Sequence, residues 1–97
     1  MSSPARLTAA TVDAWLLDHP GWERGGDGGI ARSYKFPDFA SALAFAVTVG
    51  CDAQKQDHHP DMEIGWGRAR VLWTTHDAGG VTQHDLDAAT ATDARFG

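Results

Sequence analysis

An alanine-rich stretch from Phe39 to Gln54 stands between two pairs of short strand-like segments. Its apolar residues recur at helical spacing and Pro37-Asp38 marks its start, so the stretch is predicted to form one central helix. The flanking segments carry strand signals, and each pair is joined by glycine-containing residues that favour a hairpin turn. These four segments are residues 22–24, 30–36, 62–66 and 69–75.

Two more helices are expected at the ends of the chain. Thr8 precedes the first and Thr82 the last, where a threonine hydroxyl can cap a helix. Asp85 occupies the third position of a capping box, which gives its carboxylate a structural reason to be there. The order helix, two strands, helix, two strands, helix predicts an α+β fold: a four-stranded, mainly antiparallel sheet with three helices on one face.

The length of 97 residues fits a single domain over residues 1–97, small enough that association with another copy is expected. The formal charge of −5 repels phosphate backbones and anionic lipids, and the longest apolar run, Ala42 to Val47, is too short to span a membrane. The lone Cys51 cannot form an intramolecular disulfide and is expected to be buried on the central helix. We therefore expect a cytoplasmic protein that binds neither nucleic acid nor membrane.

The histidines are the residues best suited to chemistry, because histidine ordinarily changes charge near neutral pH. His58 and His59 precede the third strand and His76 follows the fourth. If these two strands form a hairpin, all three histidines meet around a single cleft at one end of the sheet. Pro60 keeps His59 out of the helical region, and adjacent side chains in an extended backbone point apart. His58 and His59 are therefore expected to differ in role.

Three interpretations of this cluster are open. The histidines can be exposed loop residues without function, or three ligands of a catalytic metal ion. The metal interpretation is disfavoured because neighbouring ligands diverge from an extended backbone and the helical i, i+4 spacing is missing. The third interpretation is metal-free acid–base catalysis, in which one imidazole donates a proton and another accepts one. It fits the residue types best.

Beyond the cluster, the chain carries a longer series of motifs. It contains, in this order, Gly21-Trp22, Phe36-Pro37-Asp38-Phe39, Asp57-His58-His59-Pro60, Trp66, His76, Gly80-Val81-Thr82 and Asp85. This series resembles the signature of the pterin-4a-carbinolamine dehydratases, and the resemblance covers roughly residues 7 to 90.

The resemblance implies an enzyme that removes water from 4a-hydroxytetrahydropterin, the product of aromatic amino acid hydroxylases, to give the quinonoid dihydropterin. It implies no metal or organic cofactor. His58 and His76 match the family positions for acid–base catalysis, and His59 matches a position that binds and orients the pterin. It also implies dimers that extend the sheet or tetramers built through helices. A non-catalytic dimerisation or assembly factor on the same scaffold is the alternative.

Four further residues are candidates for binding the pterin. Family members often have a charged residue four positions before the first motif histidine, where this chain has Gln54, which offers only neutral hydrogen bonds. Asp57 could supply the missing charge. Trp22 and Trp66 could form an aromatic wall for a flat ring, or could equally serve in packing.

Overall fold

The computed structural model describes residues 5–96 and contains the predicted elements in the predicted order. The elements are α1 (Ala9–Asp18), β1 (Glu23–Arg24), β2 (Ile30–Lys35), α2 (Phe39–Gln56), β3 (Asp61–Gly65), β4 (Arg68–Trp73) and α3 (Gln83–Phe96). Two short 3-10 turns, η1 (Gly26–Gly28) and η2 (His76–Ala78), follow β1 and β4. The predicted α+β fold is confirmed.

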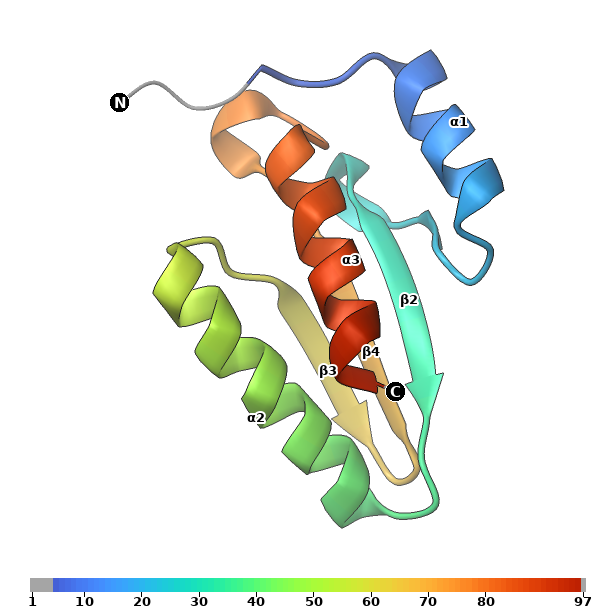
Figure 1. Ribbon diagram of the computed structural model, residues 1–97, viewed down its shortest axis with the longest axis vertical. Coiled ribbons are helices and arrows are strands. Elements are labelled where there is room, and N and C mark those ends of the chain that lie inside the picture. Colours follow the sequence, from blue (N-terminus) through green and yellow to red (C-terminus); the bar gives the residue numbers. More distant parts are fainter. Residues whose placement is uncertain (1–4, 97) are drawn as a thin grey trace.

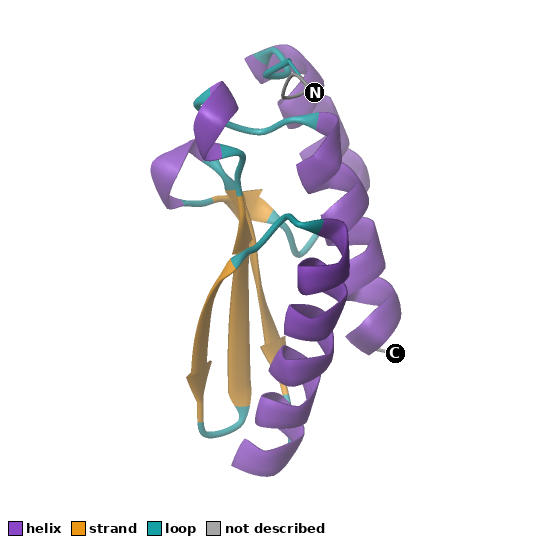
Figure 2. Cartoon of the chain, turned by 90° about the vertical axis from the view of Figure 1, so that its left-hand side faces the viewer, coloured by secondary structure: helices purple, strands orange, loops and turns teal. Residues whose placement is uncertain are grey.

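The four strands form one sheet in the order β1-β2-β4-β3, and every neighbouring pair is antiparallel. All three α-helices pack on the same face of the sheet (Figure 2). Helices α2 and α3 cross this face next to each other, and α1 lies at one end (Figure 1). The register sets Asp61 opposite Leu72, so the start of β3 lies beside the end of β4. This end of the sheet is where the candidate site forms.

The core lies between the sheet and the inner faces of the helices. Residues of α2 at helical spacing turn inward, and alternate residues of β2 and β4 meet them. The buried residues are Ala42, Phe45, Ala46, Val49 and Ala53 from α2, with Ile30, Tyr34, Ala69, Val71 and Trp73 from the strands. Cys51 is exposed, contrary to expectation, because two residues beyond the buried Val49 the helix has turned by about 200°. No helix within residues 5–96 is long and apolar enough to cross a membrane.

Helix α3 is fixed to the sheet by the carboxylate of Asp93. This carboxylate accepts hydrogen bonds from Trp22 Nε1 at 3.0 Å, Arg32 Nη1 at 3.0 Å and the Tyr34 hydroxyl at 2.5 Å. Burial, together with the hydrogen bond to Asp93, raises the pKa of Tyr34 far above its ordinary value. The phenol therefore stays protonated and keeps donating to the helix.

The hairpin of β1 and β2 packs closely on the end of β4. A Cβ atom added at Gly29 would lie 2.5 Å from the carbonyl oxygen of Trp73, whereas one added at Gly26 would meet nothing within 4 Å. Only the hydrogen atom of glycine fits at position 29, since the backbone oxygen of Trp73 cannot move aside without disturbing β4.

We expect Gly29→Ala to lower the free energy of unfolding by about 1–3 kcal/mol through overpacking. Gly26→Ala is the matched control and should change it by less than about 0.5 kcal/mol. Urea denaturation followed by circular dichroism measures both. Equal midpoints for the two variants would show that β4 does not approach Gly29 this closely.

Candidate functional site

The end of helix α2 delivers His58 to the site. Asp57 adopts a left-handed conformation, with φ 51° and ψ 39°, and its backbone N–H bonds the carbonyls of Ala53 and Gln54. The backbone N–H of His58 then donates to the carbonyl of Ala53 at 3.2 Å. Aspartate tolerates the left-handed region better than most residues, which suits it to this position. The helix therefore ends in a fixed geometry that aims His58 at the neighbouring elements.

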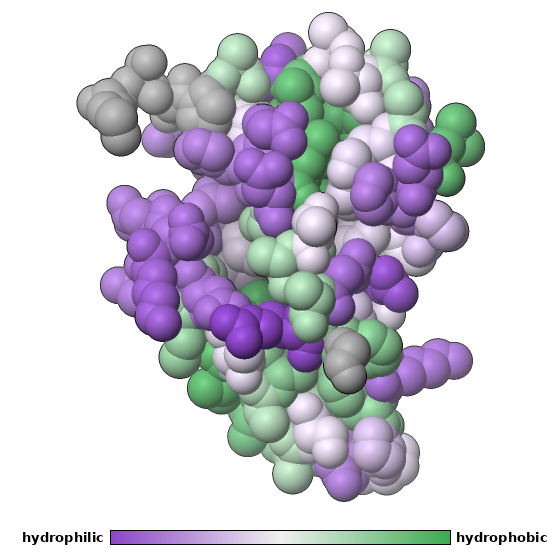
Figure 3. Space-filling view, viewed as in Figure 1, coloured by the Kyte–Doolittle hydropathy of each residue, from purple (hydrophilic) through white to green (hydrophobic). Residues whose placement is uncertain are grey.

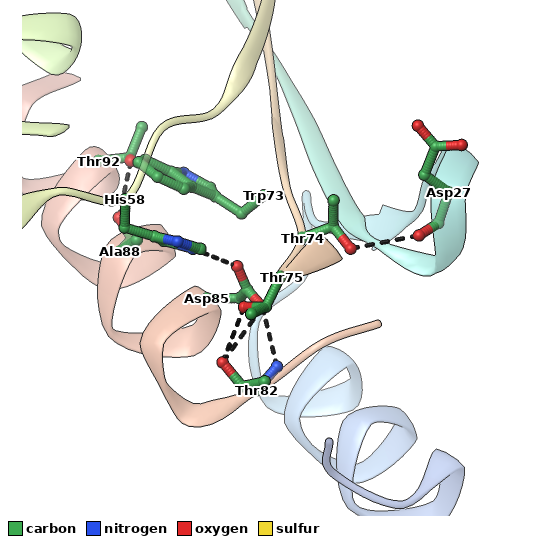
Figure 4. A network of polar contacts seen from close by, with 9 residues as sticks. All are labelled: Asp27, His58, Trp73, Thr74, Thr75, Thr82, Asp85, Ala88 and Thr92. Carbon is green, nitrogen blue, oxygen red and sulfur yellow. Dashed lines mark hydrogen bonds and ion pairs between the residues drawn. The ribbon is translucent and has the colours of Figure 1, made fainter. Parts of the chain in front are cut away.

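The carboxylate of Asp85 is the centre of the site (Figure 4). Its side chain is 0% exposed. One oxygen, Oδ1, lies 2.6 Å from Nε2 of His58, and the other accepts from the Thr75 hydroxyl and the Thr82 backbone N–H, both at 2.8 Å. The bond from Thr82 is the capping-box contact expected from the sequence. The same carboxylate therefore joins the α2–β3 junction, the end of β4 and the start of α3.

These contacts fix the orientation and the tautomer of His58. A carboxylate only accepts, so Nε2 carries the shared proton and Nδ1 of the neutral ring is left as an acceptor. The ring stacks on Trp73 with centroids 5.4 Å apart and planes 19° apart. Trp73 is itself held by a 3.1 Å hydrogen bond from Nε1 to the Thr92 hydroxyl. The result is an oriented imidazole, 17% exposed, that can accept or return a proton at Nδ1.

His59 makes a separate contact. Its Nε2 lies 2.8 Å from Oε1 of Gln54, at an exposed position one helical turn back along α2. Because an amide oxygen only accepts, Nε2 of His59 donates and its Nδ1 is left as an acceptor. The two neighbouring histidines thus bond different partners, as expected for side chains that point apart. Asp57 is exposed, and its backbone serves as the helix cap described above.

His76 lies at the start of η2 and is exposed. The residue before it, Thr75, donates to Asp85, which also binds His58. His76 is therefore the next residue in the chain after a donor to the Asp85 carboxylate. Within residues 5–96, no three histidine, cysteine, aspartate or glutamate side chains are placed to share a metal ion.

A cleft of about 570 Å³ opens between α2 and α3, a size that accommodates a bicyclic heterocycle. His58 and Trp73 line it, together with small residues such as Ala53, Ala88 and Ala91. The expectation that all three histidines meet around a single cleft is not met here: His58 lines this cleft, whereas His59 turns to Gln54 and His76 lies in η2. In the space-filling view, hydrophilic side chains cross the surface between the two helices (Figure 3).

One ion pair joins the two helices at this cleft. Asp52 of α2 accepts from Nε and Nη2 of Arg95 of α3 at 2.7 and 3.0 Å, a bidentate arrangement. The hydrogen bonds and the charge of Asp52 raise the pKa of Arg95. Both residues line the cleft, so the pair fixes the separation of its walls.

The two tryptophans considered for an aromatic wall lie elsewhere. Trp22 is buried, with its Nε1 bonded to Asp93. Trp66 is 76% exposed in the turn between β3 and β4, at the opposite end of the hairpin from His59. Neither lines the cleft, so within one chain they form no wall beside His58. The aromatic residue that does contact His58 is Trp73, which is not among the site residues expected from the sequence.

The sequence also gives no signal that His84 belongs to the site, because a single histidine within the last helix has no evident partner. In the structure its ring centroid lies 6.0 Å from that of His58, and both residues line the cleft. The one local clue is that His84 directly precedes Asp85, whose connection to His58 becomes visible only in three dimensions.

Comparison with known proteins agrees with this architecture. Residues 5–95 match the family model described as Pterin 4 alpha carbinolamine dehydratase. A protein from Roseiflexus sp. (strain RS-1), named "Putative pterin-4-alpha-carbinolamine dehydratase", is 44% identical over 88 residues, which cover 91% of this chain and 94% of the relative. A relative of the same name from Thermomicrobium roseum is 45% identical over 85 residues, covering 88% and 90%.

Solved structures add two comparisons. A transcriptional coactivator/pterin dehydratase from Brucella melitensis is 35% identical, with a TM-score of 0.87 over 95% of this chain and 99% of the other. A pterin dehydratase-like protein identified as a RuBisCO assembly factor in the alpha-carboxysome is 17% identical, with a TM-score of 0.68 over 81% and 93%, and shares the fold alone. On the family match and the curated relatives, the chain belongs to the pterin-4a-carbinolamine dehydratase family.

Proposed function

We propose that this protein is a hydro-lyase that removes water from 4a-hydroxytetrahydropterin to give the quinonoid dihydropterin, with His58 as a proton-transfer group. The observation that carries the proposal is the bond between His58 and the buried carboxylate of Asp85, whose atoms Nε2 and Oδ1 are 2.6 Å apart. A fully buried carboxylate that bonds one nitrogen of a histidine leaves the other nitrogen in a defined direction. This arrangement serves proton transfer better than it serves stability.

The reaction needs two proton transfers, one to the substrate and one from it, so that the net proton count does not change. A proton must reach the C4a hydroxyl oxygen so that the C–O bond can break and water can leave. A ring nitrogen must lose a proton so that its electrons form the new double bond. Each transfer by an aligned side chain contributes about 10²–10⁴-fold to the rate. Asp85 assists because it holds the Nε2 proton of His58 and so keeps Nδ1 in place for proton transfer.

We assign the second proton transfer to His76 and the orientation of the pterin to His59. His76 is exposed and follows Thr75, which shares the Asp85 carboxylate with His58. His59 is held by Gln54 and offers Nδ1 toward a ligand donor. Gln54 thus contributes by fixing His59, and Asp57 lies in the same turn and is exposed.

The substrate chemistry implies a source. A 4a-hydroxylated pterin arises when an aromatic amino acid hydroxylase uses a reduced pterin, so we propose that the enzyme acts in the recycling of a tetrahydrobiopterin-type cofactor in the cytoplasm. The non-catalytic alternative, an assembly or dimerisation factor, has no use for an imidazole oriented by a buried carboxylate.

We also propose that the protein functions as a dimer or tetramer. Phe39, Leu43 and Val47 stand four residues apart on the outer side of α2 and are 46%, 42% and 55% exposed. Two other large apolar residues, Ile64 and Trp66, are exposed on β3 and the turn that follows. The space-filling view shows apolar atoms along the margin where α2 runs (Figure 3). A row of exposed apolar side chains along one helix is typical of an interface between subunits.

Replacing either proton-transfer residue should abolish most activity. We expect His58→Ala and His76→Ala each to lower the turnover of a 4a-hydroxytetrahydropterin at least about tenfold, because each removes an aligned proton transfer. The assay follows quinonoid product formation with purified protein, against the uncatalysed rate in buffer. Wild-type rates in both folded variants, or a wild-type rate no faster than buffer, would reject the proposed activity.

A charge placed on the outer side of α2 should break the oligomer. We expect Val47→Lys to lower the mass measured by light scattering after gel filtration, because an interface cannot easily bury an unpaired ammonium group. Thr48→Lys is the matched control, since it adds the same charge to the same helix beside the apolar row. If both variants keep the mass of the wild type, or if the wild type is monomeric, the subunits do not associate through this face.

A further inference from the structure

We propose that His84 exchanges protons between His58 and the solvent. This inference rests on the proposed function and adds a residue to it. His84 lies in the first turn of α3, directly before Asp85. Its ring meets that of His58 edge to face, with centroids 6.0 Å apart and planes at 65°. Both side chains line the cleft between α2 and α3.

The surroundings of His58 make an exchange partner necessary. One nitrogen is held by a carboxylate that has no contact with water, and one ring face stacks on Trp73. The side chain is only 17% exposed. Protons therefore reach and leave this ring mainly through the cleft.

The elimination requires such an exchange in every cycle. The group that protonates the leaving oxygen ends the reaction without its proton, and the group that deprotonates the ring nitrogen ends with an extra one. The overall reaction releases no proton, so the two groups return to their starting states only if one proton travels between them or each exchanges with water. For His58, that path must begin in the cleft.

His84 is suited to this path by position and by chemistry. It is exposed to solvent, and two imidazoles at this separation can be bridged by a single water molecule. Among the side-chain types that line the cleft, only histidine ordinarily changes charge between pH 5 and 8. Of the remaining ionisable groups that line the cleft, Asp52 and Arg95 bind each other, and Asp87 accepts from Gln83. The last, Lys55, belongs to a side-chain type that ordinarily keeps its charge over this range.

A kinetic experiment tests the inference. At low buffer concentration we expect His84→Gln to lower kcat roughly fivefold with KM unchanged, because substrate contacts are kept while proton exchange is slowed. Added imidazole should restore the rate in proportion to its concentration. Gln83→Ala is the matched control, because Gln83 is the exposed neighbour of His84 and does not line the cleft. Its kcat should equal that of the wild type and should not change when imidazole is added. A wild-type kcat in His84→Gln, or a loss that imidazole does not repair, would overturn the inference.

A second readout requires no substrate. The Nδ1 resonance of His58 can be followed by NMR in protein labelled with ¹⁵N at histidine, and proton exchange at this nitrogen should be several times slower in His84→Gln than in the wild type or Gln83→Ala. Equal exchange rates would contradict the role of His84. Failure of the proposed function is recognised separately, as the absence of any catalysed dehydration by the wild type.

Discussion

The carboxylate of Asp85 is the interaction on which the rest of the site depends. A buried negative charge is costly unless donors surround it. Here the donors come from three segments: Thr82 at the start of α3, Thr75 after β4, and His58 after α2, which is 27 residues from Asp85 in the sequence. They coincide only when the sheet register and the end of α2 are both correct. The fold and the proposed chemistry therefore share one polar centre.

The architecture explains how so small a chain positions that centre. The antiparallel register sets the start of β3 beside the end of β4, and the left-handed Asp57 turns the chain from helix into strand at the same level. Helices α2 and α3 then close over one side of the His58 ring and leave a cleft between them. The proposed proton-transfer groups and the helix cap thus lie at one end of the sheet, beside the cleft.

Much of this was accessible from the sequence because it depends on local pattern. Helical spacing, strand alternation and glycine turns predict the element order, and the hairpin argument places the segments that carry His58 and His76 at one end of the sheet. The capping box predicts the hydrogen bond that one oxygen of Asp85 accepts from Thr82. It does not predict the bond of the other oxygen to His58, because that bond joins residues 27 positions apart. The cleft and the contacts of His84 and Trp73 with His58 were missed for the same reason, because they join segments distant in the sequence and have no local signature. Trp22 and Trp66 were expected at the site and lie elsewhere, since an aromatic side chain suits a ligand wall, a core or a surface equally well.

Substitution of Asp85 by asparagine tests the central claim most directly. Asparagine keeps the size of the side chain and an oxygen for the Thr82 cap, but it removes the carboxylate that accepts from Nε2 and orients the His58 imidazole. With folding verified by circular dichroism, we predict that kcat for dehydration falls by about 10²-fold or more while KM changes little. A folded Asp85→Asn protein with the kcat of the wild type would contradict the account.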